Sequence, residues 1–99
     1  MQLLTKAQKE KMIKNNQEQD GTKEFKAVVK LFNPTGQGTW YLSELNPDTN
    51  VAFGLCKITD EEYGYVDLNE LTSFKGQMGL GIERDRWFKP TKFEDLKVA

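Results

Sequence analysis

Hydrophobic and polar positions divide the chain into a polar N-terminal part and a longer β-rich part. Residues 27–32 form a compact run of apolar and β-branched side chains, which Asn33-Pro34 ends with a turn signal. Three more such runs follow, separated by short turn-forming segments: residues 39–45, 51–58 and 63–66. Short connections join antiparallel strands, whereas parallel strands need a long crossover. The pattern therefore predicts an antiparallel meander.

Alternation along the second of these runs predicts which side chains share a face of the sheet. Successive side chains of a strand point to opposite faces. One face is expected to hold Trp40, Leu42 and Glu44, and the other Tyr41, Ser43 and Leu45. The turn that follows combines Asn, Pro and Asp over residues 46–50, which is the clearest turn signal in the chain.

The third run contains two small residues and the only cysteine of the chain. Ala52 and Gly54 keep one face of this strand thin, as the close packing of a helix would require. Cys56 lies in an apolar stretch, so we expect it to be a buried small hydrophobic residue rather than a reactive thiol. A single cysteine forms no internal disulfide, which fits a reducing cytoplasm.

The N-terminal part has the pattern of a capped helix. Thr5 and Gln8 have the spacing of a capping box, in which each side chain binds a backbone N–H at the helix end. Good helix formers continue to about residue 14, so we predict a helix over about residues 5–14. Residues 15–24 are polar and include Asp20-Gly21, which predicts a loop.

Three shorter elements are expected after the meander. Residues 67–70 resemble a second capping box, which would open a short helix that ends near Phe74. Trp87-Phe88 is predicted to be a last short strand. Residues 91–94 have the pattern of a third helix start. Gly76 and Gly79 mark an irregular segment between these elements. A Gly-x-x-Gly loop clamps nucleic acid in KH-type proteins, but the two variable positions of this short motif hold no basic residue, so we expect a turn that needs glycine's backbone freedom.

These elements predict one α+β domain over residues 1–99. A chain of 99 residues fits a single domain, and its 11% aromatic content is typical of a packed core rather than of disorder. We expect an antiparallel sheet of about four to five strands, with short helices packed on one face. The sheet and its short helices are expected to occupy residues 25–97, after the N-terminal helix and loop.

Charge is unevenly distributed, although the net charge is only −1. Residues 1–32 and 71–99 have an excess of basic residues, and residues 43–70 have an excess of acidic ones. The whole-molecule basic footprint of a nucleic-acid-binding domain is therefore missing. No apolar run approaches the ~20 residues that span a bilayer, and the first residues lack the apolar stretch of a secretory signal. We expect a cytoplasmic protein that does not bind membranes.

The residue types exclude most enzyme chemistry. Histidine is absent, which removes the usual Ser-His-Asp and Cys-His arrangements and the commonest general base near neutral pH. The glycine-rich motifs that cradle phosphates are absent as well. We therefore expect no enzymatic activity, no catalytic residue and no cofactor.

The segment after residue 83 interleaves basic and aromatic side chains. Its candidate binding residues are Arg84, Arg86, Trp87, Phe88 and Lys89. If these side chains are exposed, they could anchor a protein interface, for which Arg and Trp are typical. Together with Lys92 and Phe93 they could instead bind single-stranded nucleic acid through phosphate contacts and base stacking. The structural alternative is an edge strand whose Trp87 or Phe88 fills the core.

Acidic residues form two further candidates. Asp60, Glu61 and Glu62 could form an anionic patch that attracts a basic partner, or simply a solvated hairpin tip. Together with Asp67 and Glu70 they could bind Mg²⁺ or Ca²⁺, as a carboxylate-dependent metal hydrolase would require. The spacing of a calcium-binding loop is missing, and helix capping explains residues 67–70 without a metal.

Six stretches that occur in order along nearly the whole chain share one resemblance: residues 3–8, 28–34, 39–45, 52–56, 64–66 and 79–85. Together they resemble an uncharacterised bacterial family, the domain of unknown function 2958. The resemblance implies accessory genes of plasmids, phages and conjugative elements, often beside antirestriction-type single-stranded-DNA-binding proteins. It implies no catalytic residue. A mobile-element setting favours an inhibitor or adaptor of host defence.

The function predicted is that of a small non-catalytic accessory protein of a mobile genetic element. It would act by binding a protein partner through its exposed side chains, with inhibition of a host defence system as the specific hypothesis. Single-stranded nucleic-acid binding through residues 84–93 is the first alternative, and a carboxylate-dependent metal hydrolase is the second. The sequence specifies neither the partner nor the oligomeric state.

Overall fold

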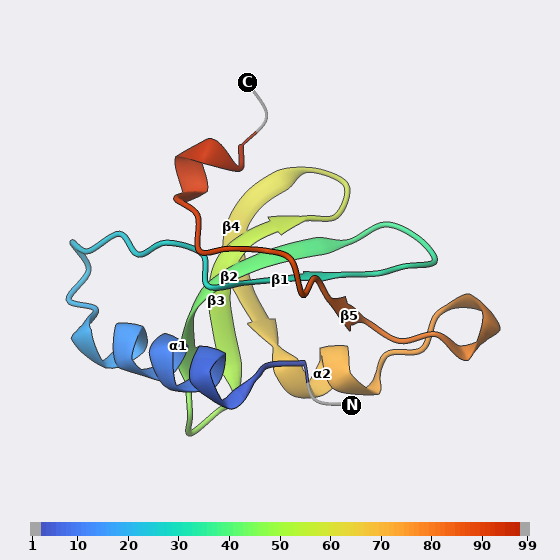
Figure 1. Ribbon diagram of the computed structural model, residues 1–99, viewed down its shortest axis with the longest axis horizontal. Coiled ribbons are helices and arrows are strands. Elements are labelled where there is room, and N and C mark those ends of the chain that lie inside the picture. The colour runs from blue at the N-terminus through green and yellow to red at the C-terminus, as the bar shows by residue number, and fades with distance from the viewer. Residues whose placement is uncertain (1–2, 98–99) are drawn as a thin grey trace.

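The computed structural model describes residues 3–97 and contains one antiparallel sheet with helices packed against it (Figure 1). Four strands form the predicted meander: β1 Val29–Phe32, β2 Thr39–Asn46, β3 Val51–Lys57 and β4 Glu61–Asp67. A fifth short strand, β5 Glu83–Arg84, pairs with β1. The strand order is β4-β3-β2-β1-β5, which leaves β4 at one edge of the sheet. The predicted α+β class and sheet size are confirmed.

The N-terminal helix, α1 Lys6–Glu18, begins at the predicted capping box. The Gln8 N–H donates to the Thr5 hydroxyl over 3.1 Å, and the Thr5 N–H donates to the Gln8 side chain over 3.0 Å. The helix continues one turn beyond its predicted end at residue 14, because Asn15 faces the sheet. Asn15 is 2% exposed, and its Nδ2 donates to the carbonyl of Ser43 over 2.9 Å.

The second helix, α2 Leu68–Ser73, follows β4 directly, as predicted. Asp67 caps it by accepting a hydrogen bond from the N–H of Asn69 over 2.8 Å. Two single 3-10 turns come later, η1 Gln77–Gly79 and η2 Phe93–Asp95. The second of them lies where the sequence predicted a third helix start.

The predicted strand at Trp87-Phe88 is wrong. The strand lies earlier, at β5, where Arg84 pairs with Leu31. The chain then turns at residues 86–87, and the N–H of Trp87 donates to Asp85 Oδ1 over 2.9 Å. A short acidic side chain that binds the backbone two residues later competes with strand pairing, which ends the strand here.

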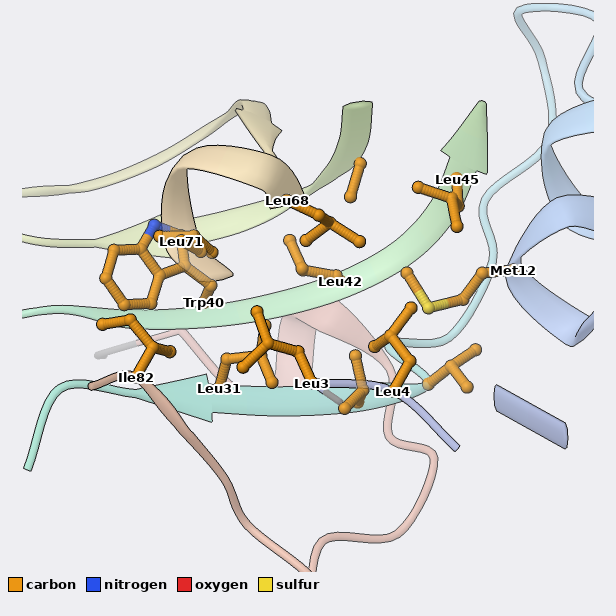
Figure 2. Packing of buried hydrophobic residues seen from close by; sticks show 13 residues of the cluster. Leu3, Leu4, Met12, Leu31, Trp40, Leu42, Leu45, Leu68, Leu71 and Ile82 are labelled. Carbon is orange, nitrogen blue, oxygen red and sulfur yellow. The ribbon is translucent and has the colours of Figure 1, made fainter. Parts of the chain in front are cut away.

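The main core lies between the sheet and the two α-helices, on what we call the helix face (Figure 2). Leu42 and Trp40 of β2 meet Leu68 and Leu71 of α2, while Met12 reaches this cluster from α1. Further members include Leu3 and Leu4 from the N-terminal residues, Leu31 of β1 and Ile82 from the segment before β5. These side chains are all at least nine-tenths buried.

A bulge in β2 changes the predicted alternation. The register with β3 shifts between Leu42 and Glu44, which makes Ser43 an extra residue. An extra residue in one strand moves every later side chain to the opposite face. Leu45 therefore joins Leu42 in the main core, and Glu44 pairs with Phe53 on the other face. The predicted faces of both residues are wrong for this reason.

Gly54 has a different role from the predicted one. A Cβ at this position would lie 1.9 Å from the carbonyl oxygen of Tyr41 and 2.8 Å from the Cα of Leu42. Both atoms belong to the backbone of β2. The space that glycine leaves is thus filled by the neighbouring strand next to its bulge, not by a helix.

The opposite side of the sheet, which we call the open face, has a thinner cover. Its cluster consists of Ala27, Leu55 and Phe93, with Tyr41, Phe88 and Leu96 packed against it. Backbone hydrogen bonds between Ala27 and Thr91, of 2.8 and 3.1 Å, attach the C-terminal segment beside β1. Figure 1 shows this segment crossing the sheet and ending in η2, on the side away from α2. Large parts of the open face are left to solvent.

Candidate functional site

The turn after β5 exposes Trp87. This side chain is 87% exposed, and Arg86 beside it is exposed as well. They border a hollow of about 380 Å³. The residues that line this hollow, which we call the Trp87 surface, are Lys30, Phe32, Arg84, Asp85, Arg86 and Trp87. Three of the predicted binding residues, Arg84, Arg86 and Trp87, are thus brought together.

Most charge at the Trp87 surface is already engaged within the fold. Lys30 Nζ lies 3.6 Å from Asp85 Oδ2, and the two side chains are 30% and 26% exposed. Arg84 Nη1 donates to the carbonyl of Leu3 over 3.2 Å. At the Trp87 surface, a partner would therefore meet the exposed Trp87 and the exposed Arg86. The other charged side chains there already bind groups of the same chain.

Phe88 and Lys89 do not line this hollow. The ring of Phe88 packs against Tyr41 with centroids 5.7 Å apart, so Phe88 is the aromatic residue that contributes to the core. Lys89 is exposed in the irregular segment that follows. The question that the sequence left open has a clear structural answer: Phe88 turns inward and Trp87 faces water.

The acidic tip lies at the hairpin between β3 and β4. Asp60 and Glu62 are exposed, whereas Glu61 pairs with Lys57 over 3.1 Å. Lys57 also donates to the carbonyl of Leu96 and lies 5.3 Å from the centroid of the Tyr41 ring. The tip is thus far from a uniform anionic patch, because one of its three carboxylates is neutralised by an internal lysine.

The remaining acidic candidates have structural roles or stand apart. Asp67 caps α2, and Glu70 lies in the first turn of that helix, where a negative charge is favourable. Within residues 3–97, no group of three or more His, Cys, Asp or Glu side chains is placed to hold a metal ion. In the same range, no helix has the length and apolar character needed to cross a membrane.

Cys56 is half-buried rather than fully buried as predicted. It packs against the main core from β3. Burial, and to a lesser degree the negative charge of Glu62, raises the pKa of its thiol above the ordinary value. A raised pKa disfavours the thiolate, which is the nucleophilic form. The local environment therefore suppresses the reactivity of this cysteine.

The Gly-x-x-Gly segment forms a tight turn. The N–H of Gly76 donates to the carbonyl of Leu80 over 2.8 Å, and Gly79 has a φ of 73°. Met78 also adopts a positive φ of 62° and is 93% exposed. Glycine's freedom at positive φ explains the motif as a turn.

A larger hollow, of about 500 Å³, lies on the open face at the β4 edge. Sequence reasoning missed it. We call this hollow the aromatic groove. Its aromatic lining residues are Phe25, Phe53, Tyr63, Tyr65 and Phe93, and its other lining residues are Gln19, Gly21, Lys23, Glu24 and Glu44. Tyr63 and Tyr65 are 42% and 76% exposed. One signal was available in the sequence: the spacing of two tyrosines at i and i+2 in a strand predicts a shared face.

The rings of the aromatic groove contact one another in sequence. Phe53 stacks on Tyr63 with centroids 6.1 Å apart and meets Tyr65 at 5.1 Å. Tyr63 in turn meets Phe93 edge-on at 5.4 Å. Such pairs are worth about 0.5–1.5 kcal/mol beyond the area that they bury, so they hold the wall of the groove in place.

The fold and these surfaces define a small α+β protein built on a five-stranded antiparallel sheet, with one closed and one open face. The chain belongs to the family described as protein of unknown function (DUF2958), whose family model matches residues 3–94. No curated protein and no solved structure matches the chain.

Proposed function

We propose that this chain is a non-catalytic module that binds a protein partner, with Trp87 as the anchor of its interface. The observation that carries the proposal is the 87% exposure of Trp87 beside the exposed Arg86. Tryptophan and arginine are the residues most enriched among those that dominate binding energy at protein interfaces. A large ring left in water on a folded surface gains the most when a partner covers it.

The charges around Trp87 favour a protein over nucleic acid as the partner. Phosphate binding needs several cations that are available to replace counterions. At the Trp87 surface, Lys30 is already paired with Asp85, and Arg84 donates to a backbone carbonyl. The net charge of −1 adds no general attraction for a polyanion. Single-stranded nucleic-acid binding through residues 84–93 therefore stays the second hypothesis.

The biological setting is a further part of the proposal. The resemblance described above implies mobile genetic elements, which supports the hypothesis of an accessory protein whose partner belongs to a host defence system. The proposal places this partner in the cytoplasm, where a lone half-buried thiol such as Cys56 stays reduced. The lack of histidine and of a nucleophile–base pair supports binding without catalysis.

Recovery of the partner with matched surface variants tests the proposal. The tagged wild-type chain, Trp87→Ala and Met78→Ala are expressed in a bacterial host, and the proteins that co-purify with each are identified by mass spectrometry. Met78 is the control, because it is 93% exposed but belongs to a different turn. We expect wild type and Met78→Ala to recover the same stoichiometric partner, and Trp87→Ala to bind it at least about 30-fold more weakly.

Two results would overturn this assignment. The first is a wild-type chain that recovers no stoichiometric partner, and the second is a partner that Trp87→Ala retains fully. Titration with a fluorescent single-stranded oligonucleotide separates the alternative. Binding that falls steeply with salt and is lost in Trp87→Ala would assign the surface to nucleic acid instead.

A further inference from the structure

The aromatic groove contains a buried carboxylate. Glu44 lines the groove and is only 8% exposed, because the bulge in β2 turns it toward the open face. Its Oε2 accepts a hydrogen bond of 3.0 Å from Gln19 Nε2, at the end of α1. In the part of the chain that the structure describes, no lysine or arginine forms an ion pair with Glu44.

This arrangement favours a cation in the groove. A carboxylate removed from water is costly unless it is hydrogen-bonded and paired with an opposite charge. Gln19 supplies a hydrogen bond but no charge. The other charged side chains of the lining, Lys23 and Glu24, are both exposed and cancel each other. Among the side chains that line the groove, the buried charge of Glu44 is therefore the one that is not balanced.

The aromatic wall attracts cations as well. The face of a tyrosine or phenylalanine ring is electron-rich and binds ammonium groups within about 6 Å of its centroid. The chain itself shows this contact, since Lys97 Nζ lies 4.5 Å from the centroid of Tyr63. Tyr65, at 76% exposed, leaves ring surface to solvent beside Phe53.

We propose that the aromatic groove binds a primary alkylammonium group, with the ammonium directed to Glu44 and the alkyl chain against Phe53 and Tyr65. The volume of about 500 Å³ falls within the roughly 300–1,000 Å³ that is typical of small-molecule sites. Two sources present this chemistry: a free small amine and the lysine side chain of a peptide. The groove shares no lining residue with the Trp87 surface, so the two assignments stand independently.

A titration followed by ¹H–¹⁵N NMR of the full chain tests the site. The probes are n-butylammonium and 1-butanol, which have similar alkyl chains and differ in charge. A second pair, Nα-acetyl-lysine amide and Nα-acetyl-norleucine amide, presents the same two groups as side chains of a peptide, with and without the ammonium. We expect saturable shifts at the amides of Glu44, Phe53 and Tyr65 with a cationic probe and not with its neutral counterpart. Tighter binding of the lysine probe than of n-butylammonium would identify a peptide side chain as the source, and tighter binding of n-butylammonium a free amine.

Three variants locate the binding energy. Glu44→Gln keeps the shape and a hydrogen bond to Gln19 but removes the charge, so the affinity should fall at least about tenfold. Tyr65→Leu removes a ring face at an exposed position and should weaken binding roughly two- to fivefold. Glu70→Gln neutralises an exposed carboxylate on α2, outside the groove, and should leave the affinity unchanged.

The proposal is wrong if neither cationic probe gives saturable shifts, or if the neutral probes bind equally well. It is also wrong if Glu44→Gln binds like wild type. Should Glu44→Gln fail to fold, Tyr65→Leu decides the matter, because an exposed side chain contributes little to folding. An unchanged affinity in that variant would overturn the assignment.

Discussion

The two faces of the sheet differ in what their side chains do. On the helix face, Leu31, Leu42 and Leu45 have no exposed surface, because α1, α2 and the N-terminal residues close over them. On the open face, Tyr63 and Tyr65 keep 42% and 76% of their surface in water. The same strands contribute to both faces, so the difference comes from what covers them. The helix face carries the stability of the fold, and the open face has apolar surface available for ligands.

Substitutions on the two faces should separate most clearly in unfolding experiments. Leu42→Ala leaves a cavity in the closed core and should lower the free energy of unfolding by about 2–5 kcal/mol. Tyr65→Ala, in the edge strand β4 on the open face, should lower it by no more than about 1.5 kcal/mol. Chemical denaturation of both variants measures the difference. Equal losses would show that the open face is part of the core, contrary to the comparison.

Glycines that face each other across β3 and β4 provide a smaller and sharper contrast. Gly54→Ala places a Cβ against the backbone of β2 and should cost about 1–3 kcal/mol. Gly64 is its register partner, and a Cβ there meets nothing within 4 Å. Gly64→Ala should be neutral or stabilise by up to about 1 kcal/mol, because it restricts the unfolded chain. Thermal unfolding of the two variants measures whether each is less or more stable than the wild type. A similar loss of stability in both would exclude the contact with the β2 backbone as the reason for the effect at Gly54.

The half-buried Cys56, which packs against the core of the helix face, should show its burial in the pH dependence of its thiol. Its thiol pKa is raised in the folded state, chiefly by burial and then by Glu62. The folded chain therefore holds the proton more tightly than the unfolded chain, and stability should fall as pH rises from the unfolded thiol's pKa toward the folded one. The rate of reaction with a thiol reagent should rise with pH only above the range of an exposed cysteine. Glu62→Gln should shift this profile slightly to lower pH, and a profile like that of a free thiol would contradict the burial.

The candidate site was only partly predictable. The segment around Arg86 and Trp87 stands out in the sequence, because it interleaves basic and aromatic residues. Which ring faces water depends on the turn that Asp85 forms with the N–H of Trp87 and on the contact of Phe88 with Tyr41. The second of these contacts joins residues far apart in the chain, and no local pattern encodes it.

The sequence by itself determined the features that depend on neighbouring residues. The capping box at Thr5, the Asp67 cap and the turn after Asn46 all follow from side chains that bind the backbone within a few positions. Local hydrogen bonds and backbone preferences act the same way wherever the segment lies, so they can be deduced from the sequence.

Only the tertiary structure decided which side chains at the end of β2 face the helices, and which residues line the aromatic groove. The bulge at Ser43 turns Glu44 into the groove, and Asn15 becomes a buried anchor through its bond to the Ser43 carbonyl. The ring that closes the groove, Phe93, comes from beyond the sheet. These outcomes depend on the packing of elements from distant parts of the chain. The contacts that stabilise them form only when those elements pack together, so no local sequence pattern reveals them.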